Sequence, residues 1–137
     1  MPIATTLAWL MLGCSSSLPL PPKAEHPPDS YVDVPYPPPA ALAETLPLRP
    51  ARAGAVWIDG DWVFRGATYS WQRGGWFELP NGGRYAPSDV RYSVEGRILF
   101  APGTWYGASH EVLPRPNRLL PALTPPNEFT SEVMTSR

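Results

Sequence analysis

The stretch that decides the fold is residues 57–76, WIDGDWVFRGATYSWQRGGW. It contains one six-residue pattern twice, starting at Trp57 and Trp71, with tryptophan at the first and sixth positions and glycine at the fourth. Weaker copies start at Tyr85 and Phe100, so the four starts lie 14, 14 and 15 residues apart. A short repeat rich in aromatic residues and glycine predicts antiparallel strands joined by tight turns.

The turn signals in this region predict which residues pair. Two residues that lie five apart face each other across a two-residue hairpin turn. Within the repeat, a turn at Asp59-Gly60 would set Trp57 opposite Trp62, and one at Arg73-Gly74 would set Trp71 opposite Trp76. Between them, a type II′ turn at Gly66-Ala67 would set Phe64 opposite Tyr69 and Trp62 opposite Trp71. Further along, a turn at Asn81-Gly82 would set Glu78 opposite Tyr85, and one at Glu95-Gly96 would join residues 91–94 to residues 97–100. The predicted fold is therefore mainly β: a small, one-sided antiparallel meander of about five to seven short strands, flanked by proline-rich disordered or extended segments.

Because side chains alternate along a strand, this register collects aromatic residues on one face of the sheet. The candidate residues are Trp57, Trp62, Phe64, Tyr69, Trp71, Trp76, Tyr85 and Trp105. In one interpretation they form the core of a domain too small to have another, since large aromatic side chains bury the most area per residue. In the other they form an exposed platform that stacks on sugar rings or on a partner chain. Glu78, Arg65 and Arg73 would then supply polar contacts at its edges.

The N-terminus carries a short apolar run, Ile3–Leu12, followed by Gly13-Cys14. About 20 apolar residues are needed to span a bilayer, so the run has the length of a signal-peptide apolar region instead. Residues 10–14 resemble a bacterial lipobox, in which Cys14 receives the lipid and becomes the first mature residue. Ser15 resembles the residue that follows this cysteine in lipoproteins sorted to an outer membrane. The alternatives are plain secretion and a buried N-terminal helix with an ordinary cysteine.

Proline divides the rest of the chain, which has 20 of these residues. The predicted organisation is a signal peptide at 1–14, a proline-rich tether at 15–53, the Trp-rich β domain at 54–107 and a proline-containing extended tail at 108–137. At about 3.1 Å per residue, the tether would hold the domain up to roughly 100 Å from its anchor. The alternative is that this segment is a proline-rich ligand for an envelope partner, with Tyr31 and Tyr36 as its anchors.

The pattern W-x-x-G-x-W followed by Y-x-W-x-x-G-x-W in Trp57–Trp76 resembles the bacterial YXWGXW (or WXXGXW) repeat proteins. These are small exported proteins or lipoproteins of largely unassigned function. The resemblance implies a place in the bacterial cell envelope, lipid-anchored at the outer membrane or else periplasmic or secreted. It implies no catalytic residue and no cofactor.

Charge and composition narrow the function further. The net charge is -1 and no basic stripe is present, which excludes a typical nucleic-acid binder. His26 and His110 are interpreted as solvated surface residues, so neither a metal site nor a catalytic constellation is predicted, and Asp59 and Asp61 are assigned to a turn. We expect a non-enzymatic structural or interaction lipoprotein that reaches the membrane through its lipid and contacts an envelope protein or glycan. The alternative is a glycan- or peptidoglycan-binding module.

Overall fold

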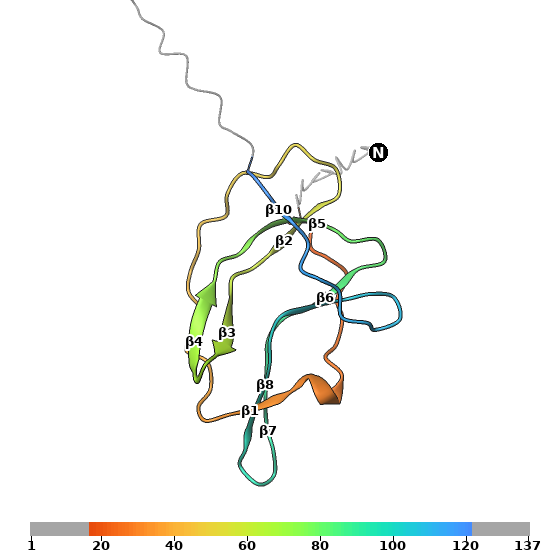
Figure 1. The fold of residues 1–137 in the computed structure, drawn as a ribbon. Coiled ribbons are helices and arrows are strands. Elements are labelled where there is room, and N and C mark those ends of the chain that lie inside the picture. The colour runs from red at the N-terminus through yellow and green to blue at the C-terminus, as the bar shows by residue number, and fades with distance from the viewer. Residues whose placement is uncertain (1–16, 122–137) are drawn as a thin grey trace, which may run out of the picture.

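The computed structural model describes residues 17–121, and within them the chain is mainly β, as predicted. Cys14, the predicted signal segment and the tail beyond residue 121 lie outside the described residues. One 3-10 turn, η1 (Pro28–Ser30), comes before the short antiparallel strands of the described residues (Figure 1). The strands are β1 (Val32–Val34), β2 (Ala55–Ile58), β3 (Asp61–Arg65), β4 (Thr68–Gln72), β5 (Gly75–Glu78), β6 (Arg84–Ala86), β7 (Asp89–Tyr92), β8 (Ile98–Ala101), β9 (Thr104–Tyr106) and β10 (Arg118–Leu119). No helix among the described residues is long and apolar enough to cross a membrane.

Strands β2 to β5 form one long hairpin, which we call ribbon A (residues 55–78). The inner strands β3 and β4 pair around Gly66-Ala67, and the outer strands β2 and β5 continue the same register. Its aromatic pairs are Phe64 opposite Tyr69, Trp62 opposite Trp71, and Trp57 opposite Trp76. The first two of these pairings were predicted correctly. The predicted meander pairings of Trp57 with Trp62 and of Trp71 with Trp76 are wrong, because the two copies of the repeat run antiparallel and pair with each other.

The reason for this correction lies at the fourth position of the repeat. Asp59-Gly60 and Arg73-Gly74 do not reverse the chain; they interrupt the ladder between its inner and outer halves. A Cβ atom on Gly74 would lie 2.7 Å from the carbonyl oxygen of Ile58 and 2.8 Å from the amide nitrogen of Gly60. The glycine therefore allows two backbones to approach closely, which is the other common use of this residue in strands.

The turn at the tip of ribbon A also differs from the prediction. Gly66 and Ala67 have φ angles of 54° and 71°, both in the left-handed region. Positive φ at both central residues is the mark of a type I′ turn, whereas type II′ needs it only at the first. Ala67 thus adopts a conformation that L-residues rarely take, because the type I′ twist suits the paired strands.

Strands β6 to β9 form a second long hairpin, ribbon B (residues 84–106), closed near Glu95-Gly96 as predicted. Its register places Val90 opposite Phe100 and Tyr85 opposite Trp105. The two weaker copies of the repeat therefore pair as the strong copies do, with a ladder break at the third and fourth positions of each. The predicted pairing of Glu78 with Tyr85 is wrong, since Glu78 lies opposite Ala55.

Segments outside the predicted domain complete the sheets. Strand β1 pairs with β8, and β10 pairs with β5. Lys23 forms a parallel bridge with Tyr85, and Trp57 N donates to the Pro19 carbonyl at 2.8 Å. The folded part therefore extends on both sides of the predicted range 54–107, and residues 17–53 pack against it instead of forming a free spacer (Figure 1).

The core lies where the outer halves of the two ribbons meet. Val56, Ile58 and Phe77 of ribbon A pack with Trp105 of ribbon B, and Leu113 of the tail segment covers them. A second cluster on the other side of β2 and β5 contains Ala55, Trp57 and Trp76, with Leu119 of β10 against it.

Candidate functional site

The predicted aromatic residues divide into two environments. Trp57, Trp76 and Trp105 are core residues, with 4%, 2% and 4% of their surface exposed. The remaining ones are half-buried: Trp62, Phe64, Tyr69, Trp71 and Tyr85. The single aromatic face predicted from alternation is therefore split at the ladder break of each ribbon, and Tyr85 and Trp105 belong to the second ribbon.

The half-buried tryptophans of ribbon A hold an extended segment of the same chain, which we call the strap (residues 36–47). Trp62 Nε1 donates to the Ala40 carbonyl at 3.2 Å. Trp71 Nε1 donates to Glu44 Oε1 at 3.1 Å. Trp76 Nε1, further along the ribbon, donates to the Pro47 carbonyl at 3.1 Å. Donors and acceptors follow the same order along the ribbon and the strap, so the strap lies lengthwise on the row of indoles.

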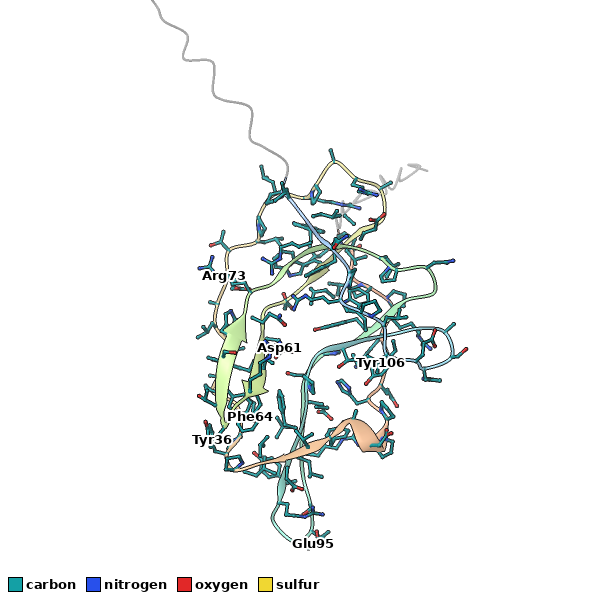
Figure 2. All side chains as sticks on the ribbon, viewed as in Figure 1. Tyr36, Asp61, Phe64, Arg73, Glu95 and Tyr106 are labelled. Atoms are coloured by element: carbon teal, nitrogen blue, oxygen red, sulfur yellow. The ribbon has the colours of Figure 1, made fainter. Side chains whose placement is uncertain are left out.

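Tyr36 fixes one end of the strap at the tip of ribbon A, where Figure 2 shows it beside Phe64. Its ring packs edge-on against Phe64 and Tyr69, with centroids 6.3 Å and 5.6 Å away. The Tyr36 hydroxyl donates to the Ala67 carbonyl at 2.9 Å, and the Tyr69 hydroxyl donates to the Tyr36 carbonyl at 3.2 Å. Tyr36 thus anchors the proline-rich segment to ribbon A of its own chain, whereas the alternative interpretation expected it to contact an envelope partner.

Glu44 supplies the charged contact of the strap. Its Oε2 accepts a hydrogen bond from Gly74 N at 2.8 Å, at the ladder break of ribbon A. Desolvation alone would raise the pKa of this carboxyl, but the hydrogen bonds from Gly74 and from the Trp71 indole outweigh it and lower the pKa below its ordinary value. The strap is therefore held by an ionised carboxylate at neutral pH.

This arrangement reproduces the chemistry of proline-rich peptide recognition. Domains that bind such peptides offer a row of aromatic side chains and indole N–H donors to the carbonyls of an extended chain. Here the segment containing Tyr36-Pro-Pro-Pro fills that role from within the molecule. The indole donors that an external sugar or peptide would need are already in use.

A cavity of about 360 Å³ lies where the N-terminal segment crosses the two ribbons. Trp57, Tyr85, Lys23, Asp59 and Asp61 contribute to its lining. Burial, followed by the charge of Asp61, raises the pKa of Tyr85 to about 12, so its hydroxyl stays protonated and able to donate. The lining therefore combines an aromatic wall with one cation, two carboxylates and a phenol.

The two carboxylates also hold the frame of the cavity together. Asp61 lies between the ribbons (Figure 2) and accepts hydrogen bonds from the Ser88 amide at 2.9 Å and the Ser88 hydroxyl at 2.6 Å. Asp59 Oδ1 accepts from Trp57 Nε1 at 2.6 Å. Sequence reasoning assigned both aspartates to a turn and missed the cavity, because its walls come from three segments that are far apart in the chain.

His26 is the other residue that the sequence placed wrongly. It was predicted on the solvated surface, but only 8% of its surface is exposed. Its Nε2 lies 2.6 Å from the Pro87 carbonyl, and its Nδ1 lies 3.1 Å from the Tyr106 hydroxyl. These contacts fasten the N-terminal segment to ribbon B, a partnership that the sequence around His26 does not signal.

The described part of the chain contains no group of three or more His, Cys, Asp or Glu side chains arranged to hold a metal ion. The chain matches no family model, no curated protein and no solved structure.

Proposed function

We propose that this protein is a lipid-anchored protein of the bacterial cell envelope with a structural or interaction role and no catalytic activity. The observation that carries the proposal is the use of the tryptophans. All four indoles of ribbon A donate within the chain, three of them to the strap and Trp57 to Asp59. The Trp-rich repeat thus serves to build a closed β body out of the residues that follow the predicted anchor.

Two features of the sequence support the location. Residues 10–14 resemble a lipobox, and the repeat resembles that of exported bacterial YXWGXW proteins. Cys14 is the single cysteine of the chain, so it has no partner for an intramolecular disulfide, and lipidation accounts for it in an exported protein.

Metabolic labelling with palmitate, followed by membrane fractionation, tests the proposal. The wild type and a Ser16→Ala control should take up label and sediment with the outer membrane. A Cys14→Ala variant should take up none and leave the membrane fraction. Equal labelling of Cys14→Ala, or membrane association that does not change, would sink the lipoprotein proposal.

The cavity favours a second candidate, binding of a glycan or of peptidoglycan. Sugars are recognised by aromatic faces combined with carboxylates that accept from their hydroxyl groups, and the half-buried Tyr85 lies with Asp59 and Asp61 in the lining of the cavity. This candidate moves the binding site from the aromatic platform predicted by the sequence to the cavity.

Tryptophan fluorescence with soluble peptidoglycan fragments distinguishes the two candidates. Glycan binding predicts a saturable change in emission that is reduced by Lys23→Ala, at the cavity, and kept by Arg97→Ala. Arg97 of ribbon B lies away from the cavity lining, in a surface ion pair with Asp33 of β1. An emission spectrum that the fragments leave unchanged counts against the glycan site and leaves the structural role.

A further inference from the structure

We infer that the end of the molecule around the Trp57–Trp76 pair docks on a lipid bilayer through a set of exposed leucines. We call these the leucine end: Leu18, Leu20, Leu46, Leu48 and Leu120. The inference rests on the proposed lipid attachment at Cys14, and it adds the orientation of the β body and the surface that meets the membrane.

The first argument is the length of chain between the anchor and the folded body. Pro19 is already fixed on ribbon A, because its carbonyl accepts from Trp57 N at 2.8 Å. An extended chain covers at most about 3.6 Å per residue, so the five steps from Cys14 to Pro19 reach less than about 20 Å. A lipid on Cys14 therefore holds the Trp57–Trp76 end close to the bilayer. Among the described residues, 17–53 do not form the spacer of roughly 100 Å predicted from the proline content, because they pack along the ribbons.

The second argument is what this end exposes. Three segments converge there: residues 17–20 through the Pro19 contact, residues 46–48 through the bond from Trp76 Nε1 to Pro47, and β10 through the pairing of Leu119 with Trp76. Figure 1 shows β10 and the loop before β2 at the same end of the molecule. The exposed fractions are 38% for Leu18, 62% for Leu20, 48% for Leu46, 56% for Leu48 and 83% for Leu120.

Single exposed apolar residues are common on protein surfaces, but here five exposed leucines come from three segments that converge at one end, so they form a patch rather than a scatter. Cations accompany these leucines in the chain: Arg49 directly follows residues 46–48 and Arg118 belongs to β10, and both side chains are exposed. Apolar side chains accompanied by arginines match the two layers of a bilayer surface, acyl chains beneath anionic headgroups. The charge of these arginines favours the bilayer over a second copy of the chain, which would bring like charges together.

The opposite end of the molecule provides a matched control. The β7–β8 tip, where Figure 2 labels Glu95, includes Val94, which is 100% exposed. Val94 is as apolar as the leucines but lies on ribbon B, near none of the three convergent segments. A probe at Val94 and a probe at Leu48 therefore differ in position and not in local polarity.

The test uses the full-length lipidated protein in vesicles of phosphatidylethanolamine and phosphatidylglycerol. Lipidation consumes the thiol of Cys14, so Leu48→Cys and Val94→Cys each introduce one reactive thiol for an environment-sensitive fluorophore. The docked orientation predicts a blue-shifted emission at residue 48, quenched several-fold more strongly by a quencher carried on lipid than the emission at residue 94.

Each outcome separates this inference from the proposed function. Lipid on Cys14, established by the mass of the purified protein, together with equal quenching at the two positions overturns the docking and leaves the anchor. A blue shift at residue 48 that lipid-borne quencher does not reduce means that protein covers the leucines, and it also overturns the docking. Absence of lipid on Cys14 overturns both.

Discussion

The fourth position of the repeat makes a quantitative prediction for Gly74→Ala. Gly74 lies at the ladder break of ribbon A, and a Cβ atom there would lie 2.7 Å from Ile58 O, 2.8 Å from Gly60 N and 2.9 Å from Glu44 Oε2. Two of these neighbours are backbone atoms, which no change of rotamer can move away. The third is the carboxylate that anchors the strap, so the methyl group disturbs the ribbon and the strap together.

The size of the effect follows from this crowding. Inserting one carbon into a well-packed site typically lowers the free energy of unfolding by about 1–3 kcal/mol. Because backbone atoms surround Gly74, we expect a loss of about 3 kcal/mol there. For a domain of this size, 1 kcal/mol changes the melting temperature by roughly 4–8 °C, so Gly74→Ala should melt about 12–24 °C below the wild type. Gly96→Ala is the comparison, because Gly96 has a φ of 81° and no atom within 4 Å of an added Cβ. It should lose only about 1 kcal/mol, from left-handed strain alone.

Urea unfolding followed by tryptophan emission, together with thermal melting by circular dichroism, measures both variants. The reasoning requires Gly74→Ala to lose clearly more stability than Gly96→Ala, although only Gly96 has a positive φ. If the two variants lose the same amount, or if Gly74→Ala is the milder one, the close approach at the ladder break does not determine the fold of ribbon A.

Three further changes test the strap, the buried histidine and the turn. Glu44→Gln should cost about 1 kcal/mol at pH 7. Because the folded pKa of Glu44 is depressed, this difference should persist above its ordinary value of 4.5 and disappear as the pH falls through the lower folded value, which urea midpoints from pH 7 to pH 3 would reveal. His26→Phe should cost about 2 kcal/mol in urea unfolding, since it leaves the Tyr106 hydroxyl and a carbonyl without their partner, whereas the exposed His110→Asn should stay within about 0.5 kcal/mol. Ala67→Gly should stabilise the protein by about 0.5–1 kcal/mol, because it relieves a φ of 71°, and an unchanged or lower melting temperature would contradict this.

The sequence showed the repeated pattern, but the pairing predicted from it was wrong in part. Two strong copies were clear in the sequence and two were weak, and in the structure all four interrupt their ladder at the same positions. A glycine flanked by polar residues has the same local signature whether it turns the chain or lets two backbones meet. Local rules therefore predicted hairpins at Asp59-Gly60 and Arg73-Gly74. The structure instead has one long hairpin, ribbon A, in which both copies of the repeat pair in a single register.

The sequence alone determined the class of fold and the tight turns at Gly66-Ala67 and Glu95-Gly96, because alternation of side chains and turn chemistry are local properties. It also located the aromatic residues that hold the molecule together. Only the tertiary structure decided which segments of the chain pack against those aromatic residues. The proline-rich segment lies on the Trp62–Trp71–Trp76 row, and His26 and the N-terminal segment close over ribbon B, through contacts between residues 22 to 80 positions apart. Proline restricts the backbone of that segment to an extended form without specifying what it lies against, so composition predicted its conformation, and the partner became visible only when the two ribbons were in place.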